Sequence, residues 1–312
     1  FMSTEDDAAP GNLGLKDQTL AMQWVYDNIA AFGGDTSRIT IMGESAGSAS
    51  VHYQMLVPSA AGLFSGAIMQ SGNAFGPWAS GRKYLWAAQE IALHFDCPTL
   101  PTDALVTCLQ GANAHEIDAM YIYFIEWNFQ PFYFCPRVDG DYLPEEPAIL
   151  AKEGRYNHAP TIMGIDREEM ALETLEWYFD PLLLIRLAEN FTYYGPITLE
   201  LSEDEDPTAT ATAVYDYYNG GTNFSKDHAN DLTRVIPPFP SFNKRALHYG
   251  SCNHEISRIM LTDRMFGITQ DWLVELVSEQ DPVYVFELHH RGEHGYSNWY
   301  LNNGLDLPQA AN

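Results

Sequence analysis

The segment that most constrains the fold is a five-residue turn between a predicted strand and a predicted helix. Residues 38–42 form a short, β-branched run that is typical of a strand buried in a sheet. Residues 46–56 return to helical spacing and end before Pro58. Between these two elements, residues 43–47 read Gly-Glu-Ser-Ala-Gly. A strand, a tight turn and a helix in this order form the context of a G-x-S-x-G nucleophile elbow, in which the turn lifts the serine hydroxyl above the sheet.

The same five residues also fit a simpler interpretation, a glycine-rich turn without a catalytic role, because G-x-S-x-G occurs by chance in many sequences. The flanking strand and helix favour the elbow. In that interpretation Ser45 is the nucleophile. The backbone N–H of Ala46, at the start of the helix, then donates a hydrogen bond to the oxyanion that develops during acyl transfer.

Other apolar runs extend this strand and helix into a sheet. A helix is predicted from about Asp17 to Ala31 and is stopped by Gly33 and Gly34. Its apolar stripe, which we expect to be the buried face, consists of Leu20, Ala21, Trp24, Val25 and Ile29, interrupted by Asn28.

Further strands are predicted at residues 66–70, 160–164 and 282–288. Between about Tyr84 and Ala151 the sequence predicts helices interrupted by prolines. Strands that alternate with helices favour an α/β fold, with a mostly parallel sheet and crossover helices. Because no internal repeat or low-complexity linker is present, we treat residues 1–312 as one domain or part of one.

The composition narrows the classes of function. With 46% apolar and 19% charged residues, the chain can bury a substantial core. Its 42 acidic and 16 basic residues give a formal charge of −26, which repels nucleic-acid phosphates and anionic lipid headgroups. No window approaches the roughly 20 consecutive apolar residues of a membrane span. The acidic run at 203–207 is interpreted as a solvated loop rather than a metal site.

Cysteines and sequons favour an oxidising compartment. Cys97 and Cys108 bracket a ten-residue loop that a disulfide could close, whereas Cys135 and Cys252 stay unassigned. Two sequons, at Asn190 and Asn223, would accept glycans if the chain enters the secretory path. We therefore expect a secreted or extracellular protein. The N-terminal residues have neither the basic flank nor the apolar stretch of a signal peptide, so targeting cannot be inferred from them.

Several motifs in order along the chain resemble the type-B carboxylesterase and cholinesterase family. The resemblance covers the first half densely and the second half at islands. It implies the α/β-hydrolase fold and a disulfide between Cys97 and Cys108, and we expect residues 1–312 to be one partial domain that is truncated at both ends. The motifs lie at residues 11–18, 32–35, 43–48, 70–72, 77–79, 97–108, 134–141 and 283–291.

The resemblance also places the acid of a Ser-acid-His triad. Residues 164–169 are similar to the family's G-x-x-x-x-E-G segment, which assigns the orienting carboxylate to Glu169. Met170 stands where the family has glycine, so the backbone conformation at this point is open, and the adjacent Glu168 is a competing candidate. The alternative is that both glutamates are surface carboxylates on a helix that starts near Asp166.

The family's histidine has no counterpart in the sequence. His289, His290 and His294 sit on the last predicted strand or just after it, too early for a loop to carry a side chain back over the sheet. We therefore expect the catalytic histidine beyond Asn312 and the glycine-rich oxyanion loop before Phe1. An isolated chain of these 312 residues is then expected to be inactive.

Four more residues match family positions around the substrate. Glu44 and Ser71 match positions at the base of the site, and Trp78 and Phe132 match positions where bulky side chains form the acyl pocket. Aromatic residues there favour small acyl groups. The alternative for Trp78 and Phe132 is an ordinary role in the core, which is common for aromatic residues.

These residues lead to two hypotheses of different classes. The first is a serine hydrolase of small carboxylic esters that works through an acyl-enzyme and needs no metal or cofactor. The second is a non-catalytic adhesion or receptor domain, since some members of the family serve as such and most of those have lost the serine. Ser45 and its intact elbow favour the enzyme. Association with a membrane is expected only through an anchor outside these residues.

Overall fold

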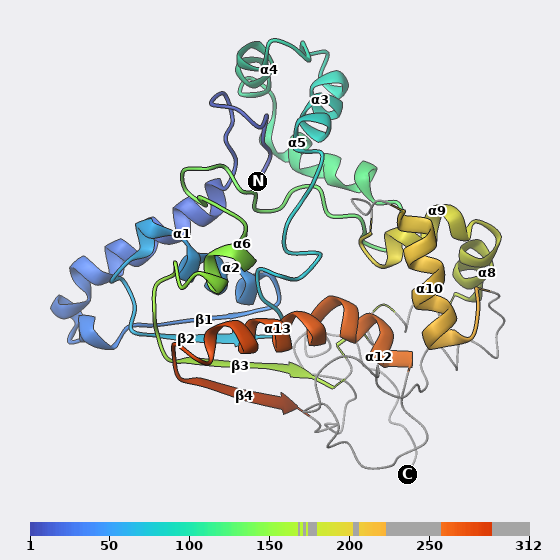
Figure 1. The fold of residues 1–312 in the computed structure, drawn as a ribbon. Coiled ribbons are helices and arrows are strands. Elements are labelled where there is room, and N and C mark those ends of the chain that lie inside the picture. The colour runs from blue at the N-terminus through green and yellow to red at the C-terminus, as the bar shows by residue number, and fades with distance from the viewer. Residues whose placement is uncertain (168, 171–172, 174–179, 202–205, 223–256, 289–312) are drawn as a thin grey trace, which may run out of the picture. The chain divides into compact units, whose positions relative to one another are not determined.

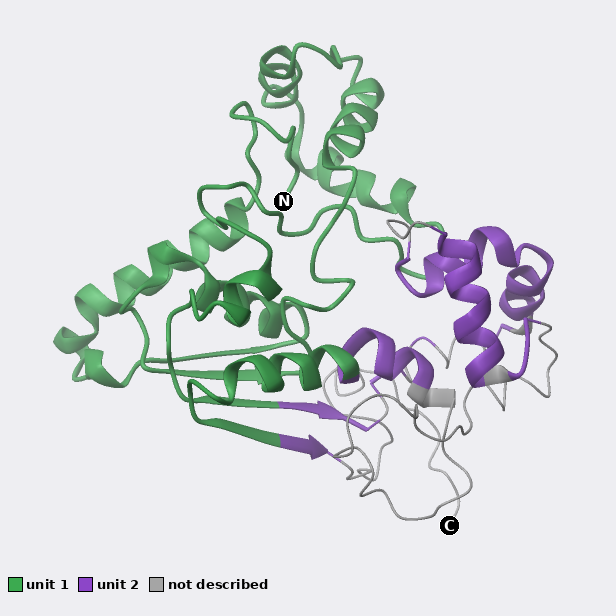
Figure 2. Cartoon of the chain, viewed as in Figure 1, with its two compact units in different colours: residues 1–163, 268–285 green, residues 164–267, 286–312 purple. Residues whose placement is uncertain are grey.

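The computed structural model describes residues 1–167, 169–170, 173, 180–201, 206–222 and 257–288. The chain divides into two compact units, which Figure 2 colours separately. The first unit contains residues 1–163 and 268–285, and the second contains residues 164–267 and 286–312. Each unit is described by itself.

Four strands form one sheet in the order β1-β2-β3-β4 (Figure 1). They are β1 Thr40–Glu44, β2 Gly66–Gln70, β3 Thr161–Asp166 and β4 Val283–Leu288. All four lie where the apolar runs predict strands. Strands β1 and β2 are parallel, with a register that runs from the Thr40–Gly66 pair to the Glu44–Gln70 pair. The two strands therefore end side by side.

Helix α2, Ala46–Leu56, is the crossover between β1 and β2 and begins directly after Ser45. Figure 1 shows it next to both strands, which it contacts. Every residue of α2 from Val51 to Leu56 is buried. The apolar ones join a core with residues of β2, of α6 (Pro147–Lys152) and of α13 (Ile268–Val277). The nucleophile turn is thus supported by a packed layer.

Helix α1, Leu13–Asn28, followed by a 3-10 turn at Ile29–Phe32, matches the predicted helix but buries a different face. Leu20 and Trp24, expected inside, are 69% and 57% exposed, while Leu15 and Thr19 are buried. The prediction of the buried face was wrong because α1 meets its neighbours partly through polar groups.

The polar seam beside α1 is centred on the hydroxyl of Thr19. Thr19 Oγ1 donates to Leu15 O or to Gln54 Oε1 of α2, and it lies 2.8 Å from both Gln54 Oε1 and the Tyr142 hydroxyl. Gln54 Nε2 donates to Leu15 O at 2.9 Å. These buried groups satisfy one another, so this face of α1 packs without a continuous apolar stripe.

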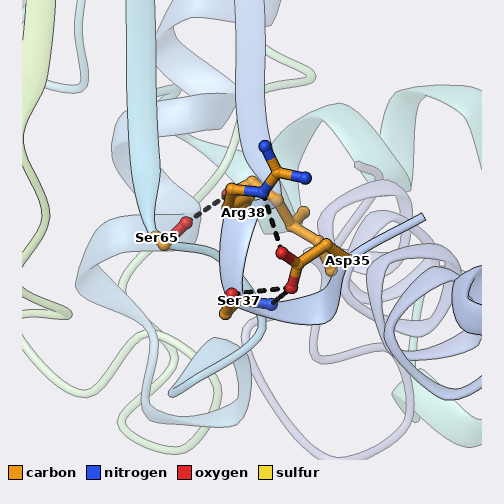
Figure 3. A network of polar contacts seen from close by, with 5 residues as sticks. Asp35, Ser37, Arg38 and Ser65 are labelled. Atoms are coloured by element: carbon orange, nitrogen blue, oxygen red, sulfur yellow. Dashed lines mark hydrogen bonds and ion pairs between the residues drawn. The ribbon is translucent and has the colours of Figure 1, made fainter.

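The start of β1 is fixed by a polar turn (Figure 3). Asp35 Oδ1 accepts hydrogen bonds from the backbone N–H and hydroxyl of Ser37, and its Oδ2 forms an ion pair with Arg38 at 2.8 Å. These donors lower the pKa of Asp35, the hydroxyl of Ser37 most of all. Ser65, just before β2, donates its N–H and hydroxyl to Ile39 O. The beginnings of the two strands are therefore tied together.

Two of the sequence motifs meet at Asn12, directly before α1. Asn12 Nδ2 donates to Arg137 O at 2.8 Å and to Asp139 Oδ2 at 3.0 Å, and Asn12 Oδ1 accepts the backbone N–H of Arg137. Asn12 is fully buried and has a left-handed backbone (φ 60°). These contacts join segments 125 residues apart.

A helical excursion follows β2. Helices α3, Tyr84–His94, and α4, Thr102–Leu109, are separated by the predicted proline-rich break. α5, Ala114–Ala119, and a 3-10 turn at Met120–Phe124 complete it. The predicted disulfide between Cys97 and Cys108 is confirmed, with a Cα–Cα distance of 5.7 Å. Cys97 belongs to the apolar cluster of this excursion, and Cys108 packs against that cluster.

The described part of the second unit is mainly helical. Asp206, at the end of the acidic run, accepts the N–H of Ala209 and caps α10, whereas residues 203–205 lie outside the described part. Tyr215 of α10 is fully buried, and its hydroxyl lies 2.7 Å from Thr198 Oγ1 of α9. The helices of this unit are α8 Pro181–Glu189, α9 Phe191–Thr198, α10 Pro207–Asn219 and α12 Ser257–Thr262, which is followed by a π-helical turn at Asp263–Gly267.

Candidate active site

Ser45 occupies the tight turn between β1 and α2 with an unusual backbone. Its dihedral angles are φ 56° and ψ −121°, a conformation that residues with a Cβ rarely adopt. The N–H of Ser45 donates to Gln70 O at 2.9 Å, which extends the pairing of β1 with β2 by one residue. The carbonyl of Ser45 accepts the N–H of Ala49 in the first turn of α2. The strained residue is therefore held on both sides by the sheet and the helix.

The glycine on the strand side of Ser45 makes this turn possible. A Cβ on Gly43 would lie 2.2 Å from both the carbonyl carbon and the carbonyl oxygen of Gly47, a separation that real Cβ atoms do not show. A Cβ on Gly47 would meet nothing within 4 Å. Only the first glycine of the motif is therefore required by the close approach of strand and helix.

The ends of β1 and β2 bring three of the predicted site residues together. Glu44 is the last residue of β1, Ser45 follows it, and Ser71 follows β2. The register pairs Glu44 with Gln70, so Ser71 lies one residue past the partner of Glu44. All three are partly exposed. Carboxyl ends of parallel strands are the usual place for ligand sites in α/β sheets.

The first turn of α2 offers free donors beside Ser45. Ala46 is the first residue of the helix, so its N–H has no acceptor within α2, and Ala46 is exposed. Unpaired N–H groups at a helix N-terminus favour negative charge. The position of Ala46 is therefore compatible with the oxyanion role that the sequence predicts for it.

The loop after β2 is bound to α2 at two further points, one of which sequence reasoning missed. Ser48 Oγ donates to Gly72 O at 2.5 Å. His52 Nδ1 accepts the N–H of Ala74 at 3.1 Å. His52 is buried, and its burial lowers the pKa of the imidazole to about 3, so the ring is neutral and Nδ1 is available as an acceptor. Helical spacing of seven residues from Ser45 was the signal that could have indicated His52.

An aromatic chain continues from His52 into the rest of the first unit. The Phe75 ring packs against His52 at a centroid distance of 5.1 Å and against Trp272 of α13 at 5.0 Å. The loop that carries Ser71 is therefore fixed between α2 and α13. A neutral histidine in this place acts as a structural acceptor.

Trp78 and Phe132, the predicted acyl-pocket residues, lie in segments that contact each other. Trp78 is partly buried and packs against the main core, and its carbonyl is 3.5 Å from the sulfur of Cys135. Phe132 is partly buried, with its ring centroid 5.8 Å from that of Phe129. Tyr53 of α2 donates to Ala79 O at 3.0 Å and ties the Trp78 loop to the nucleophile helix.

Glu169 lies in the turn after β3 and belongs to the second unit. Strand β3 extends through Asp166, and Glu169 lies in a turn, so no helix begins at Asp166 itself. Glu169 Oε1 accepts the N–H of Asp166 at 2.8 Å. Met170 is buried, donates its N–H to Thr262 Oγ1 at 3.3 Å and is not among the described residues with a left-handed backbone. Methionine therefore causes no left-handed strain here. Glu168 lies outside the described residues.

Two of the described histidines have hydrogen-bond partners away from Ser45. His52 accepts from Ala74, and His158 Nδ1 lies 2.7 Å from Asp281 Oδ2. Among the described residues, no histidine is hydrogen-bonded to Ser45. The histidines of the last predicted strand and beyond, His289, His290 and His294, lie outside the described residues.

The remaining predicted positions lie elsewhere in the structure. Asn190 is exposed between α8 and α9, whereas Asn223 and Cys252 lie outside the described residues. In the part of the chain that is described, no three His, Cys, Asp or Glu side chains are grouped so that they could hold a metal ion. Among the described helices, none has both the length and the apolar character needed to cross a membrane.

Comparison with known proteins places these features in a family. The profile of the Carboxylesterase family matches residues 1–306. Venom carboxylesterase-6 of Apis mellifera is 30% identical over 309 residues, which are 95% of this chain and 51% of that protein. Bile salt-activated lipase of Mus musculus is 44% identical over 154 residues, 48% of this chain and 26% of that protein. Neuroligin-3 of Mus musculus is 37% identical over 185 residues, 58% of this chain and 22% of that protein.

The chain spans about half the length of the curated relatives that match it over most of its residues. The family profile covers nearly the whole chain, and the serine turn, the parallel β1–β2 pair and the disulfide agree with the resemblance inferred from the sequence motifs. The chain belongs to the carboxylesterase family and has the α/β-hydrolase fold of that family.

Proposed function

We propose that the protein is a serine hydrolase of small carboxylic esters and that Ser45 is its nucleophile. The observation that carries the proposal is the backbone of Ser45, which has φ 56° at the junction of β1 and α2. A strained conformation on a strand-to-helix turn is the context in which a serine acts as a nucleophile in α/β-hydrolases. The family match and the relatives named as esterases or lipases support the same reaction class.

The proposed reaction has two halves. The Ser45 hydroxyl attacks the ester carbonyl while a histidine takes its proton, and the tetrahedral oxyanion is bound by the N–H of Ala46 together with N–H groups outside this chain. The histidine returns the proton to the leaving alcohol, and an acyl-enzyme forms. Water then repeats the steps with the acyl group, while Glu169 holds the imidazolium.

In our proposal, two parts of the catalytic site lie outside residues 1–312. We assign the catalytic histidine to the polypeptide after Asn312 and the glycine-rich oxyanion loop to the polypeptide before Phe1. Glu44 and Ser71 would line the base of the site, and Trp78 and Phe132 would bound the acyl group. The substrate is a small ester, and no metal or cofactor takes part.

Hydrolysis of a short-chain aryl ester tests the proposal. Protein produced from a transcript that includes the coding sequence on both sides should turn the ester over, and the same protein with Ser45→Ala should lose about 10⁶-fold in kcat. The 312-residue chain alone should give no turnover and react only slowly with a fluorophosphonate. Equal turnover by the longer protein and its Ser45→Ala variant would overturn the proposal.

A second candidate function is a non-catalytic adhesion or receptor domain. The similarity to neuroligin-3 favours it, since that match covers 58% of this chain. The two candidates differ in what they require of Ser45. An adhesion domain tolerates any residue that the turn accepts, whereas an enzyme needs the hydroxyl. A longer protein whose histidine position holds another residue would support the adhesion role.

A further inference from the structure

We propose that Asn190 is a site of N-glycosylation and that its glycan covers an exposed apolar surface of α8 and α9. This inference does not depend on the proposed hydrolase activity. Asn190 begins the sequence Asn-Phe-Thr at residues 190–192, which is an acceptor sequence for N-linked glycans. The sequence pattern alone is weak, because such tripeptides arise often by chance, so the argument depends on the local structure.

In the folded unit, the three residues of the sequon are arranged so that a glycan added during translocation is accommodated. Asn190 and Thr192 are both exposed, whereas Phe191 between them is partly buried. The Phe191 ring packs edge-to-face on Tyr215 of α10 at a centroid distance of 5.0 Å. A Cβ on Gly195 would lie only 2.7 Å from the same ring. Phe191 therefore anchors the segment and leaves the amide and the hydroxyl on its two sides outside.

The side chain of Asn190 does not cap the helix that follows it. Asn190 precedes the first residue of α9, a position where asparagine commonly caps the helix, yet its side chain makes no capping hydrogen bond. Its backbone connects the helices instead, because its N–H donates to Arg186 O and its carbonyl accepts the N–H groups of Tyr193 and Tyr194. A glycan on Nδ2 therefore displaces no capping interaction.

The two helices that Asn190 joins carry exposed apolar side chains. Leu182 and Ile185 of α8 and Tyr193 of α9 are exposed, Leu182 by 69%. They lie within eight residues of Asn190 in the sequence, on the two helices that it joins. A hydrated oligosaccharide attached there would shield these side chains from association with other molecules.

An oxidising compartment is the environment in which this modification takes place. The disulfide between Cys97 and Cys108, in the other unit of the chain, is of the kind that persists in such a compartment. The donor is a lipid-linked oligosaccharide diphosphate. Transfer forms a bond between Asn190 Nδ2 and the anomeric carbon, breaks the bond from that carbon to the diphosphate oxygen, and passes one amide proton to a base of the transferase.

The test is expression of the 312 residues behind a secretion signal in a eukaryotic host, in an Asn223→Gln background that leaves only the Asn190 sequon. We expect treatment with peptide-N-glycosidase F to lower the apparent mass of the protein by the mass of one glycan. In Asn190→Gln and Thr192→Ala the treatment should leave the apparent mass unchanged. Thr192→Ser keeps the acceptor sequence and should retain the glycan. Addition of the glycan occurs during translocation, so these results do not depend on the stability of each variant.

Mass spectrometry of the deglycosylated peptide gives an independent readout, because the enzyme converts a glycosylated asparagine to aspartate. Conversion at Asn190 supports the proposal. Two results would overturn it: an unmodified Asn190 in the secreted protein, or an unchanged mobility of Asn190→Gln relative to its parent. Asn190→Gln should also bind more of a hydrophobic dye than the glycosylated parent, and equal binding would overturn the shielding role.

Discussion

The turns that hold Ser45 and Glu169 both follow a strand of the sheet, but different interactions build them. Ser45 is fixed by backbone geometry, through the close approach of Gly43 to Gly47 within the five-residue motif and through the hydrogen bond to Gln70 of the neighbouring strand. Glu169 follows β3 in a turn where its carboxylate accepts the N–H of Asp166. The adjacent Met170 donates its backbone N–H to Thr262 Oγ1, 92 residues later in the chain.

This difference explains why the Ser45 turn can be predicted from the sequence more easily than the Glu169 turn. The close approach of two backbone segments permits only glycine at position 43, so the sequence motif itself shows this requirement. A carboxylate that is held by a backbone N–H and by distant packing leaves no comparable pattern. We therefore expect a substitution of Gly43 to act through folding and a substitution of Glu169 to act through catalysis.

Apart from the loss of Ser45 itself, the largest expected effect concerns Glu169 and its neighbour. In the longer protein that contains the catalytic histidine, Glu169→Gln should lower kcat by about 10³ to 10⁴-fold, because the histidine loses its orienting charge. Glu168→Gln is the matched control and should change kcat less than about threefold, because in our proposal this carboxylate does not orient the histidine. Steady-state kinetics with a short-chain aryl ester measure both. The reverse ranking would transfer the role to Glu168.

The second prediction compares the two glycines of the elbow. Gly43→Ala should lower the free energy of unfolding by about 3 kcal/mol or more, because its Cβ would lie 2.2 Å from backbone atoms of Gly47 that cannot move independently. Gly47→Ala should leave it unchanged or raise it by up to about 1 kcal/mol, since the new Cβ meets open space and alanine favours the helix. Urea unfolding of the two variants and the wild type measures the free energy of unfolding of each. Equal destabilisation would show that the turn is not limited by this approach.

The elements around the elbow could be predicted because their signals are local. The strands at 40–44 and 66–70 are short apolar runs that end in glycine or turn residues, and α2 begins where the sequence predicts it. The buried face of α1 could not be predicted in the same way. Periodicity finds the apolar stripe of Leu20 and Trp24, but burial follows the neighbours, which here are Gln54 and Tyr142.

The candidate site shows the same limit. Ser45 and its neighbours follow from one motif, and Glu44 and Ser71 follow from the resemblance to the family, while the register places them at the ends of β1 and β2. His52 was missed because a lone histidine in an apolar helix is usually a core residue, and its spacing from Ser45 does not show that it accepts a hydrogen bond from the loop after β2. The partner of Met170 could not be inferred either, because Thr262 is 92 residues away in the sequence and no spacing rule connects them.

A third prediction uses the buried His52. Its pKa is about 3 in the folded protein and near 6.5 when exposed, so the unfolded chain binds a proton that the folded one excludes. Above pH 6.5 the imidazole is neutral in both states, so this difference does not change the free energy of unfolding. Below pH 6.5 the unfolded chain takes up the proton, so the free energy of unfolding falls. We expect a loss of about 1.4 kcal/mol per pH unit below pH 6.5, or about 2 kcal/mol at pH 5.

Two variants separate protonation from packing at His52. His52→Gln offers the N–H of Ala74 an acceptor that does not titrate, so its unfolding free energy should fall less steeply between pH 7.5 and pH 5. His52→Leu leaves that N–H buried without an acceptor and should cost about 1 to 3 kcal/mol at every pH. Urea unfolding at several pH values gives both numbers. Parallel pH profiles for the wild type and His52→Gln would contradict the buried, neutral state.

The smallest expected effect concerns the two faces of α1. Thr19→Val keeps the shape of the side chain but leaves the buried Gln54 and Tyr142 without their shared hydroxyl, and it should cost about 1 to 2 kcal/mol of unfolding free energy. Leu20→Gln changes an exposed residue of similar helix propensity and should stay within about 0.5 kcal/mol. The order would be reversed if the apolar stripe were the packed face, because removal of a buried leucine costs more than loss of a hydroxyl. Chemical denaturation of this pair therefore tests whether the polar seam, rather than the apolar periodicity, joins α1 to the helix that supports Ser45.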